Sequence, residues 1–168
     1  PEERGVRLFP GDGEKKEKTG LTAGDARMER KREHCKAVFR TPLGWAGVSA
    51  SDKGVCRIVL PGKDKKDVER ELKSEVGTIS PGRDCKTVDR AVKLLRKYFS
   101  GGRVSFDLPL DIHYYYTAFQ QAVWKAAAEI PFGGTRSYGW IAKRIRNPKA
   151  VRAVGRAMGA NPIPIIIP

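Results

Sequence analysis

The amino-acid sequence predicts an α+β protein in which a small sheet with helices precedes a helical unit. Residues 36–60 hold three short apolar runs separated by turn signals, the pattern of a β-meander. Residues 64–99 carry apolar side chains at helical spacing, which predicts two surface helices. After residue 117 the helical spacing returns and is interrupted by Pro and Gly. We therefore expect a charged arm over 1–34, an α/β domain over 35–110 and a helical domain over 111–168.

The arm mixes Gly, Lys, Glu and Arg with few large apolar side chains. Residues 1–35 carry 9 basic and 8 acidic side chains, so their charges nearly cancel. Such a composition is typical of a disordered segment, because it offers too little apolar surface to bury. A helix over 23–34 is a weaker alternative, and we expect the arm to be solvated rather than to contact a partner.

Turn residues divide the α/β domain into its expected elements. Residues 41–44 (TPLG) and 51–54 (SDKG) are the two turns of the meander. The carboxylates of this domain show no metal-ligand spacing, so we expect no catalytic role here. The expected elements are strands at 37–39, 45–50 and 55–60, helices at 64–76 and 87–99, and a candidate strand at 104–108.

The helical domain begins with a capping signal. Thr117 is followed three residues later by Gln120, which predicts a capping box and a helix that runs to Glu129. A turn at 131–134 (PFGG) ends this unit. The side chains expected to face inward are Phe119, Val123, Ala126 and Ile130.

Two short helices joined by a tight break are expected over residues 137–160. Ser137 is the expected N-cap of the first helix, and Pro148 is expected to begin the second. Gly155 and Gly159 flank the basic face of the second helix, where a flat partner could approach the backbone. This arrangement is typical of a helix-turn-helix on nucleic acid, although a solvated basic face would give the same pattern. The two faces of the second helix are Val151, Val154 and Met158 against Lys149, Arg152 and Arg156.

Charge favours an acidic partner. The chain has a formal net charge of +14 and a pI of about 10.0. Residues 112–168 carry 8 basic side chains and 1 acidic one, and no Asp or Glu occurs from Ile130 onward. Nucleic acid is therefore the leading partner. No apolar run approaches the roughly 20 residues of a membrane span, and no secretory signal is visible.

The cysteines indicate a reducing compartment. Cys35, Cys56 and Cys85 are an odd and sparse set, which is not typical of a disulfide framework, so we expect an intracellular protein of the cytoplasm or nucleus. Cys56 is expected to be a buried strand residue and the other two structural or incidental. A zinc site of these cysteines with His34 is disfavoured, because the spacings match no standard ligand pattern.

A nearly continuous set of short motifs runs through the second half of the chain: 119–124 (FQQAVW), 130–133 (IPFG), 137–138 (SY), 141–142 (IA), 147–150 (NPKA), 152–155 (RAVG) and 161–168 (NPIPIIIP). With these motifs the chain closely resembles the O6-alkylguanine-DNA alkyltransferase family. The resemblance implies a ribonuclease-H-like first domain, with Pro42-Leu43-Gly44 in its first hairpin, and a winged-helix second domain.

This resemblance implies DNA repair by a single-turnover enzyme. Family members bind DNA through the minor groove, rotate the alkylated guanine out of the stack and transfer the alkyl group irreversibly to their own cysteine. The implied protein is a monomer that uses no cofactor. The family motif continues with Cys-His-Arg after the position of Pro168, so no catalytic residue lies within these 168 residues. We therefore expect a fragment that binds DNA without transferring alkyl groups. It is expected to be cut at both ends, because it starts with Pro1 and ends in an Ile-rich run (165–168) that is more typical of the entry to a core strand than of a free terminus.

The resemblance also assigns roles to individual residues. Arg152 is the implied finger that fills the gap left by the rotated base, with Ala153 and Gly155 as small neighbours in the groove. Tyr138 is implied to crowd the 3′ phosphate of the target nucleotide. The remaining implied roles are the hinge for Asn161, the base pocket for Pro164, and DNA backbone contacts for Asn147 and Gln120. Trp140 departs from relatives, which often place Glu or Gln there.

Two alternatives stay open at this point. An alkyltransferase-like protein would have the same fold and would bind the lesion without transfer, because another residue replaces the cysteine. A plain winged-helix regulator would prefer a sequence over a lesion and would not need the motif at 161–168. The residue after Pro168 separates repair from lesion binding alone.

Overall fold

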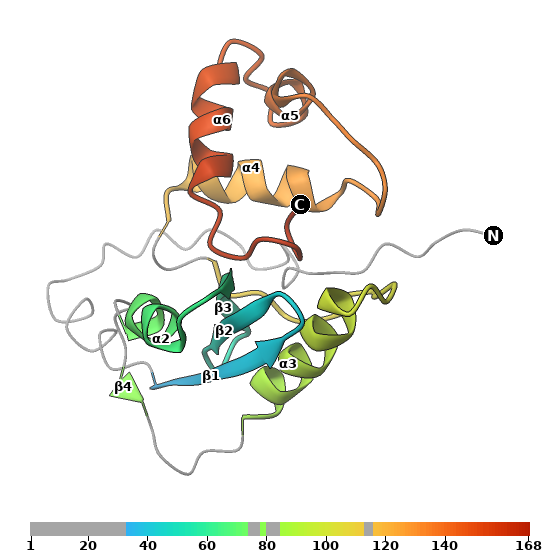
Figure 1. Ribbon diagram of the computed structural model, residues 1–168. Coiled ribbons are helices and arrows are strands. Elements are labelled where there is room, and N and C mark those ends of the chain that lie inside the picture. The colour runs from blue at the N-terminus through green and yellow to red at the C-terminus, as the bar shows by residue number, and fades with distance from the viewer. Residues whose placement is uncertain (1–32, 74–77, 80–84, 113–115) are drawn as a thin grey trace, which may run out of the picture.

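The computed structural model describes residues 33–73, 78–79, 85–112 and 116–168 (Figure 1). The predicted arm therefore lies outside the described residues except at its end. There, residues 33 and 34 already belong to the first strand, so the alternative helix over 23–34 does not extend to them.

Four strands form one sheet in the first half of the chain. They are β1 (Glu33–Thr41), β2 (Gly44–Ala50), β3 (Val55–Gly62) and β4 (Thr78–Ile79), in the order β3-β2-β1-β4. The pairs β1–β2 and β2–β3 are antiparallel, and the short β4 joins β1 in parallel. The predicted meander of three strands is confirmed.

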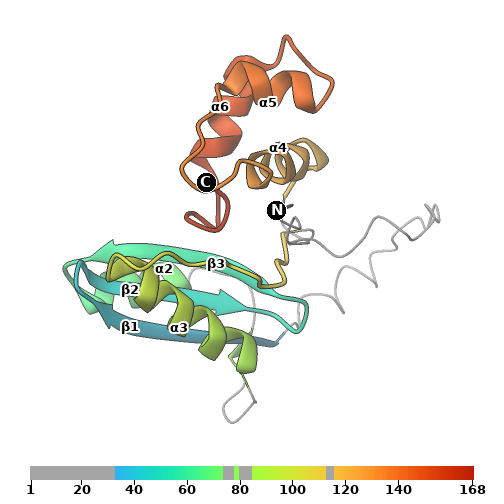
Figure 2. The same ribbon diagram turned by 90° about the vertical axis from the view of Figure 1, so that its right-hand side faces the viewer.

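Helices α2 (Lys65–Lys73) and α3 (Lys86–Phe99) cover opposite faces of this sheet, with α3 in front of it and α2 behind it in Figure 2. Alternation along β2 explains the division, because neighbouring residues of a strand point to opposite faces. Val48 joins the core beneath α3, whereas Gly47 faces α2. A Cβ at Gly47 would lie 2.7 Å from Leu72 Cδ1 and 2.8 Å from Val68 Cγ1, so only glycine lets α2 pack this closely.

The candidate strand at 104–108 does not form, and this prediction is wrong. Residues 102–109 are irregular, and Leu110 makes a single parallel bridge to Val55 at the start of β3. The Val55 amide donates to Pro109 O over 2.8 Å, and the Asp111 amide donates to Val55 O over 2.9 Å. This segment therefore follows the outer edge of β3 only briefly before the chain enters the second half.

Three helices form the second half: α4 (Ala118–Ala128), α5 (Tyr138–Arg144) and α6 (Val151–Gly159). Both predicted caps are confirmed. Thr117 Oγ1 accepts from the Gln120 amide over 3.2 Å, and Gln120 Oε1 accepts from the Thr117 amide over 3.0 Å. Ser137 Oγ accepts from the Trp140 amide over 3.2 Å.

The break between α5 and α6 is longer than the sequence predicts. Arg146 adopts φ 58°, and the Asn147 amide donates to Ala142 O over 2.9 Å, which closes the end of α5. The second helix begins at Val151, so Pro148 lies in the turn and not at the first helical position. Val151 is correspondingly exposed, and the buried face of α6 consists of Val154 and Ala157.

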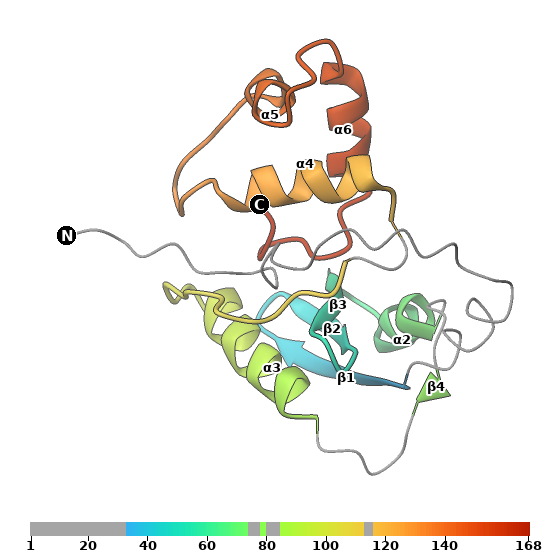
Figure 3. The same cartoon turned by 180° about the vertical axis from the view of Figure 1, so that it is seen from behind.

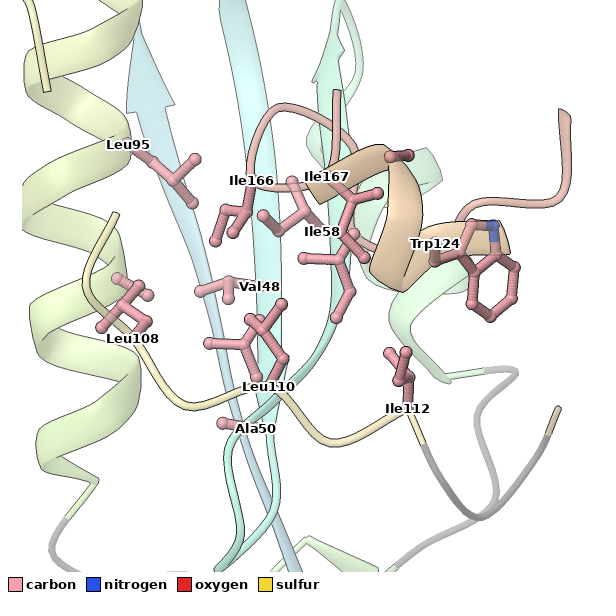
Figure 4. Packing of buried hydrophobic residues seen from close by; sticks show 14 of the residues in the cluster. Val48, Ala50, Ile58, Leu95, Leu108, Leu110, Ile112, Trp124, Ile166 and Ile167 are labelled. Carbon is pink, nitrogen blue, oxygen red and sulfur yellow. The ribbon is translucent and has the colours of Figure 1, made fainter. Parts of the chain in front are cut away.

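The segment after α6 runs between α4 and the sheet, as Figure 3 shows. Its three buried isoleucines lie in the same core as Ile58 of β3 and Trp124 of α4 (Figure 4). The Ile58 amide also donates to Pro162 O over 2.9 Å, so the sheet edge holds this segment directly. The Ile-rich end of the chain is therefore largely buried, and it lies in an irregular turn and not in a strand. The buried isoleucines are Ile163, Ile166 and Ile167.

The cysteine prediction is wrong in one respect. Cys35 of β1 and Cys85, the residue before α3, form a disulfide with Cα atoms 5.9 Å apart. They are 50 residues apart in sequence, and the sheet topology brings them together. The argument for a reducing compartment therefore loses its basis. Cys56 is a buried residue of β3, as expected.

The described residues contain neither a candidate metal site nor a candidate membrane span. No group of three or more His, Cys, Asp and Glu side chains in this part of the chain could hold a metal ion. Within the same ranges, no helix combines the length and the apolar character that crossing a membrane requires.

Candidate nucleic-acid interface

The surface around α5 and α6 carries one sign of charge. Its seven cationic side chains are all exposed, and we call them the basic surface: Arg136, Lys143, Arg144, Arg146, Lys149, Arg152 and Arg156. Glu129 at the end of α4 contacts one of them, with its Oε2 2.7 Å from Arg144 Nε. This hydrogen bond, helped by the negative charge, raises the pKa of the Arg144 guanidinium above its usual value. A surface of this kind attracts phosphate groups.

Tyr138 stands at the start of α5 with its ring against α6. Its side chain is 49% exposed, and Ser137 caps the helix directly before it. A Cβ built on Gly155 would lie 3.2 Å from Tyr138 Cε2 and 3.3 Å from Cδ2, so the ring occupies the space that a side chain at 155 would need. The expectation that Gly155 leaves the backbone open is therefore wrong. Gly159 does meet the expectation of an open backbone, because nothing lies within 4 Å of its Cβ position.

Arg152 lies one turn before Gly155 on α6 and is exposed. Because residues three apart share one face of a helix, Arg152 points to the side on which the Tyr138 ring packs. Within the described part of the chain, Arg152 forms no salt bridge, so its guanidinium is available to a partner. Ala153, the next residue, is half-buried.

Asn161 connects the end of α6 to the segment that follows it. Its backbone amide donates to Met158 O over 3.1 Å, in the last turn of α6. Its side chain bonds in two directions: Oδ1 accepts from the Ile163 amide over 3.0 Å, and Nδ2 donates to Ile167 O over 2.8 Å. These bonds close a tight loop over residues 161–167, so the loop and α6 form one connected unit.

The loop contains a backbone conformation that the sequence does not reveal. Ile165 adopts φ 77°, which is a genuine outlier for a β-branched side chain. Its neighbour Pro164 is half-buried and bridges to Ile167, and the Ile167 amide donates to Ile163 O over 3.0 Å. Strain of this sort persists only where the surrounding structure enforces it, and it is concentrated at functional sites.

Two further residues that were expected to contact DNA make hydrogen bonds within the protein. The Oε1 atom of Gln120 belongs to the capping box of α4. Asn147 is exposed in the turn between α5 and α6, where its carbonyl accepts from the Ala150 amide over 3.0 Å. Asn147 is therefore exposed beside Arg146 of the basic surface, whereas a side-chain oxygen of Gln120 is already bonded within the protein.

Two tryptophans contact the helices that carry the basic surface or belong to them. Trp124 is fully buried, and its Nε1 donates to Ala157 O over 2.9 Å, which fixes α6 on α4. The sequence gives no signal for this bond, because the expected inward face of α4 omits Trp124. Trp140 is half-buried, and the Arg136 guanidinium carbon lies 5.6 Å from its ring centroid. The aromatic ring thus interacts with one of the seven cations of the basic surface.

Comparisons with known proteins agree with this geometry. Residues 118–168 match the family model described as the DNA-binding domain of 6-O-methylguanine DNA methyltransferase. The methylated-DNA–protein-cysteine methyltransferase of Methanosarcina acetivorans is 39% identical over 133 residues, which are 79% of this chain and 78% of the relative. That of Methanosarcina mazei is 58% identical over 74 residues, or 44% of this chain and 46% of the relative.

A solved structure is also similar to this chain in fold and in sequence. The crystal structure of the Mycobacterium tuberculosis OGT protein in complex with DNA has a TM-score of 0.61 and 36% identity to this chain, and the match covers 79% of this chain and 74% of that one. The α+β fold predicted from the sequence is confirmed by this likeness. The chain belongs to the family of methylated-DNA–protein-cysteine methyltransferases.

Proposed function

We propose that the chain binds duplex DNA through the minor groove, rotates an O6-alkylguanine out of the stack and presents it to a cysteine of the protein itself. The family motif has this acceptor directly after the position of Pro168. The reaction is a displacement at carbon: the thiolate sulfur bonds to the alkyl carbon, the bond from that carbon to guanine O6 breaks, and guanine takes up a proton. It needs no cofactor.

One observation carries the proposal: Tyr138 and Arg152 share one side of the α5–α6 pair, and α6 leads directly into the loop held by Asn161. A base inside a duplex must leave the stack before any nucleophile can reach it. In our proposal Tyr138 crowds the phosphate on the 3′ side of the target nucleotide, and Arg152 takes the place of the extruded base. Side chains that wedge into the minor groove act in this way in other DNA-bending proteins.

The remaining residues supply binding and geometry. The basic surface neutralises phosphates, with Asn147 at its edge and Ala153 and Gly155 on the helix that enters the groove. Gln120 is the weakest of the proposed DNA contacts, because the cap of α4 already uses one of its side-chain atoms. Pro164 lines the pocket for the extruded base, and Asn161 is the hinge between helix and pocket. The substrate is DNA, so we place the protein in the cytoplasm or nucleus, acting as a monomer.

The decisive experiment uses the full-length gene. The protein is incubated with a duplex that contains one O6-methylguanine, and its intact mass is measured beside a control duplex with ordinary guanine. We expect a mass gain of one methyl group with the lesion duplex alone. An unchanged mass with lesion-selective binding would instead indicate an alkyltransferase-like protein. Equal binding to both duplexes without a mass gain would refute the proposal.

A further inference from the structure

We infer that Gly155 is a positioning residue for Tyr138: the missing side chain at 155 sets where the tyrosine ring stands and thereby how well the lesion is rotated out. The inference rests on the proposed function, in which Tyr138 acts on the DNA backbone. It differs from the simpler idea that glycine on α6 serves only to let DNA approach the helix.

A side chain at 155 would crowd the Tyr138 ring. The two ring carbons on one edge of Tyr138 lie 3.2 and 3.3 Å from the position of a Cβ at Gly155. Distances this short are ones that real Cβ atoms rarely show, so a side chain at 155 would have to move the ring. The backbone of Tyr138 cannot easily follow, because Ser137 caps α5 directly before it. An alanine at 155 would therefore push the ring away from α6 by a few tenths of an ångström, and a larger side chain would displace it further.

The backbone of α6 does not require glycine at this position. Gly155 lies in the interior of the helix, where glycine is a poor helix former, and it does not have a positive φ. Gly159 lies in the same helix and also lacks a positive φ, but nothing lies within 4 Å of its Cβ position. The two glycines thus separate cleanly: only the one at 155 faces the Tyr138 ring.

Displacing the ring alters the side of the molecule that meets DNA. Arg152 lies one turn from Gly155, so the Tyr138 ring and the Arg152 side chain flank the same patch of α6. Turning the ring outward changes the space that a nucleotide would enter between them. The cations of the basic surface stay where they are. Selective binding of the lesion should therefore suffer, while binding to ordinary duplex should persist.

The test compares two substitutions at each glycine: Gly155→Ala and Gly155→Leu, with Gly159→Ala and Gly159→Leu as matched controls. Each variant is titrated with one duplex that contains O6-methylguanine and with the same duplex without it. We expect the ratio of the two affinities to fall about threefold for Gly155→Ala and about tenfold for Gly155→Leu, as for coupled neighbouring residues. The Gly159 position is open to DNA, so its variants can lower the affinity for both duplexes alike, but they should keep the ratio of the parent protein because no ring lies beside them.

A double-variant cycle shows whether Gly155 acts through Tyr138. In a Tyr138→Ala background, Gly155→Leu should have no further effect on the affinity ratio. The ring itself is followed by NMR, through the nuclear Overhauser contact between the Tyr138 ring protons and the α-protons of residue 155. That contact should weaken in Gly155→Ala even if Gly155→Leu fails to fold, while Gly159→Ala retains it.

The outcomes separate this inference from the proposed function. If Tyr138→Ala lowers the affinity ratio and the Gly155 variants do not, the positioning role is wrong and the proposed function stands. If Gly155→Leu lowers the ratio equally with and without Tyr138, residue 155 contacts DNA directly and the inference is again wrong. If neither Tyr138→Ala nor Arg152→Ala changes the affinity ratio, the proposed function is wrong, and the inference that rests on it is wrong as well.

Discussion

The side-chain amide of Asn161 donates to the carbonyl of Ile167 over 2.8 Å, and so closes the loop that follows α6. The other end of the same side chain accepts from the Ile163 amide, which makes one residue responsible for both sides of the turn. Both isoleucines are buried, so water cannot replace these bonds. The loop geometry therefore depends on an asparagine at this position.

Replacing Asn161 by alanine should destabilise this loop. The change removes both side-chain bonds, and leaving buried backbone groups unsatisfied costs about 1–3 kcal/mol each. Hydrogen exchange should become faster at the Ile163 and Ile167 amides, and urea should unfold the protein at a lower concentration. Asn147→Ala is the matched control, because Asn147 is exposed in a turn; its unfolding midpoint should stay near that of the parent. Equal exchange rates in the parent and Asn161→Ala would contradict the assigned role.

Ile58→Ala should destabilise both halves of the molecule together. Ile58 is 3% exposed and lies in the core shared by the sheet and the loop, so truncation should cost about 2–5 kcal/mol. Leu60 on the same strand is 51% exposed, and Leu60→Ala should change stability by less than about 0.5 kcal/mol. Tryptophan fluorescence, to which Trp45 of the sheet and Trp124 and Trp140 of the helical half contribute, and far-ultraviolet circular dichroism should report one common transition in urea. Separate transitions in the parent would show that the core is not shared.

Trp124→Phe should loosen α6. The substitution keeps an aromatic ring but leaves the Ala157 carbonyl without its indole donor, at a cost of about 1–3 kcal/mol. Trp140→Phe is the comparison, because Trp140 is half-buried and its nitrogen makes no such bond in the described contacts. Thermal unfolding measures both variants. The prediction is wrong if Trp140→Phe lowers the melting temperature as much as Trp124→Phe does.

Arg152→Ala should weaken lesion binding far more than Lys149→Ala. In its proposed role as the finger that replaces the extruded base, Arg152 would act only on rotated DNA, so we expect a loss of about tenfold or more for the lesion duplex. A phosphate contact by Lys149 should instead lower affinity for lesion and control duplexes alike, and its removal should reduce the salt slope by about 1. Titrations at several salt concentrations distinguish the two. Equal losses for both variants on both duplexes would make Arg152 an ordinary phosphate contact.

Reducing the protein should lower its stability. The Cys35–Cys85 disulfide closes a loop across 50 residues, and removing such a link typically costs about 2–4 kcal/mol. Urea unfolding with and without a reducing agent measures this difference. Cys35→Ser should unfold at the reduced midpoint in both conditions. If the urea midpoint of the parent protein is the same with and without the reducing agent, the Cys35–Cys85 disulfide does not form in solution.

Local signals predicted the elements of the fold well. The Thr117 and Ser137 caps and the strands of the meander follow from residues that are close in sequence, and each is present. One error is local, because Pro148 lies in the turn and does not begin the second helix. The other errors concern relations between distant parts. The strand expected at 104–108 lacks a partner along its length, and the Cys35–Cys85 pair depends on how β1 and α3 meet.

Prediction of the site from the sequence was limited in the same way as prediction of the fold. Family resemblance named Tyr138, Arg152 and Asn161, but it could not reveal that Gly155 faces the Tyr138 ring rather than open space. Nor could it reveal that Ile165 takes a positive φ, because nothing about an isoleucine in a run of three predicts that conformation. Such facts depend on packing across the molecule, which a single sequence does not state.

The burial of Ile163, Ile166 and Ile167 against β3 bears on how the protein is made. A ribosome releases the sheet about a hundred residues before it releases these isoleucines, at roughly 5–20 residues per second, so the nascent sheet spends several seconds with an uncovered apolar edge. Over that interval we expect the growing chain to offer a binding site for cellular chaperones, which translation of the loop after α6 would finally cover.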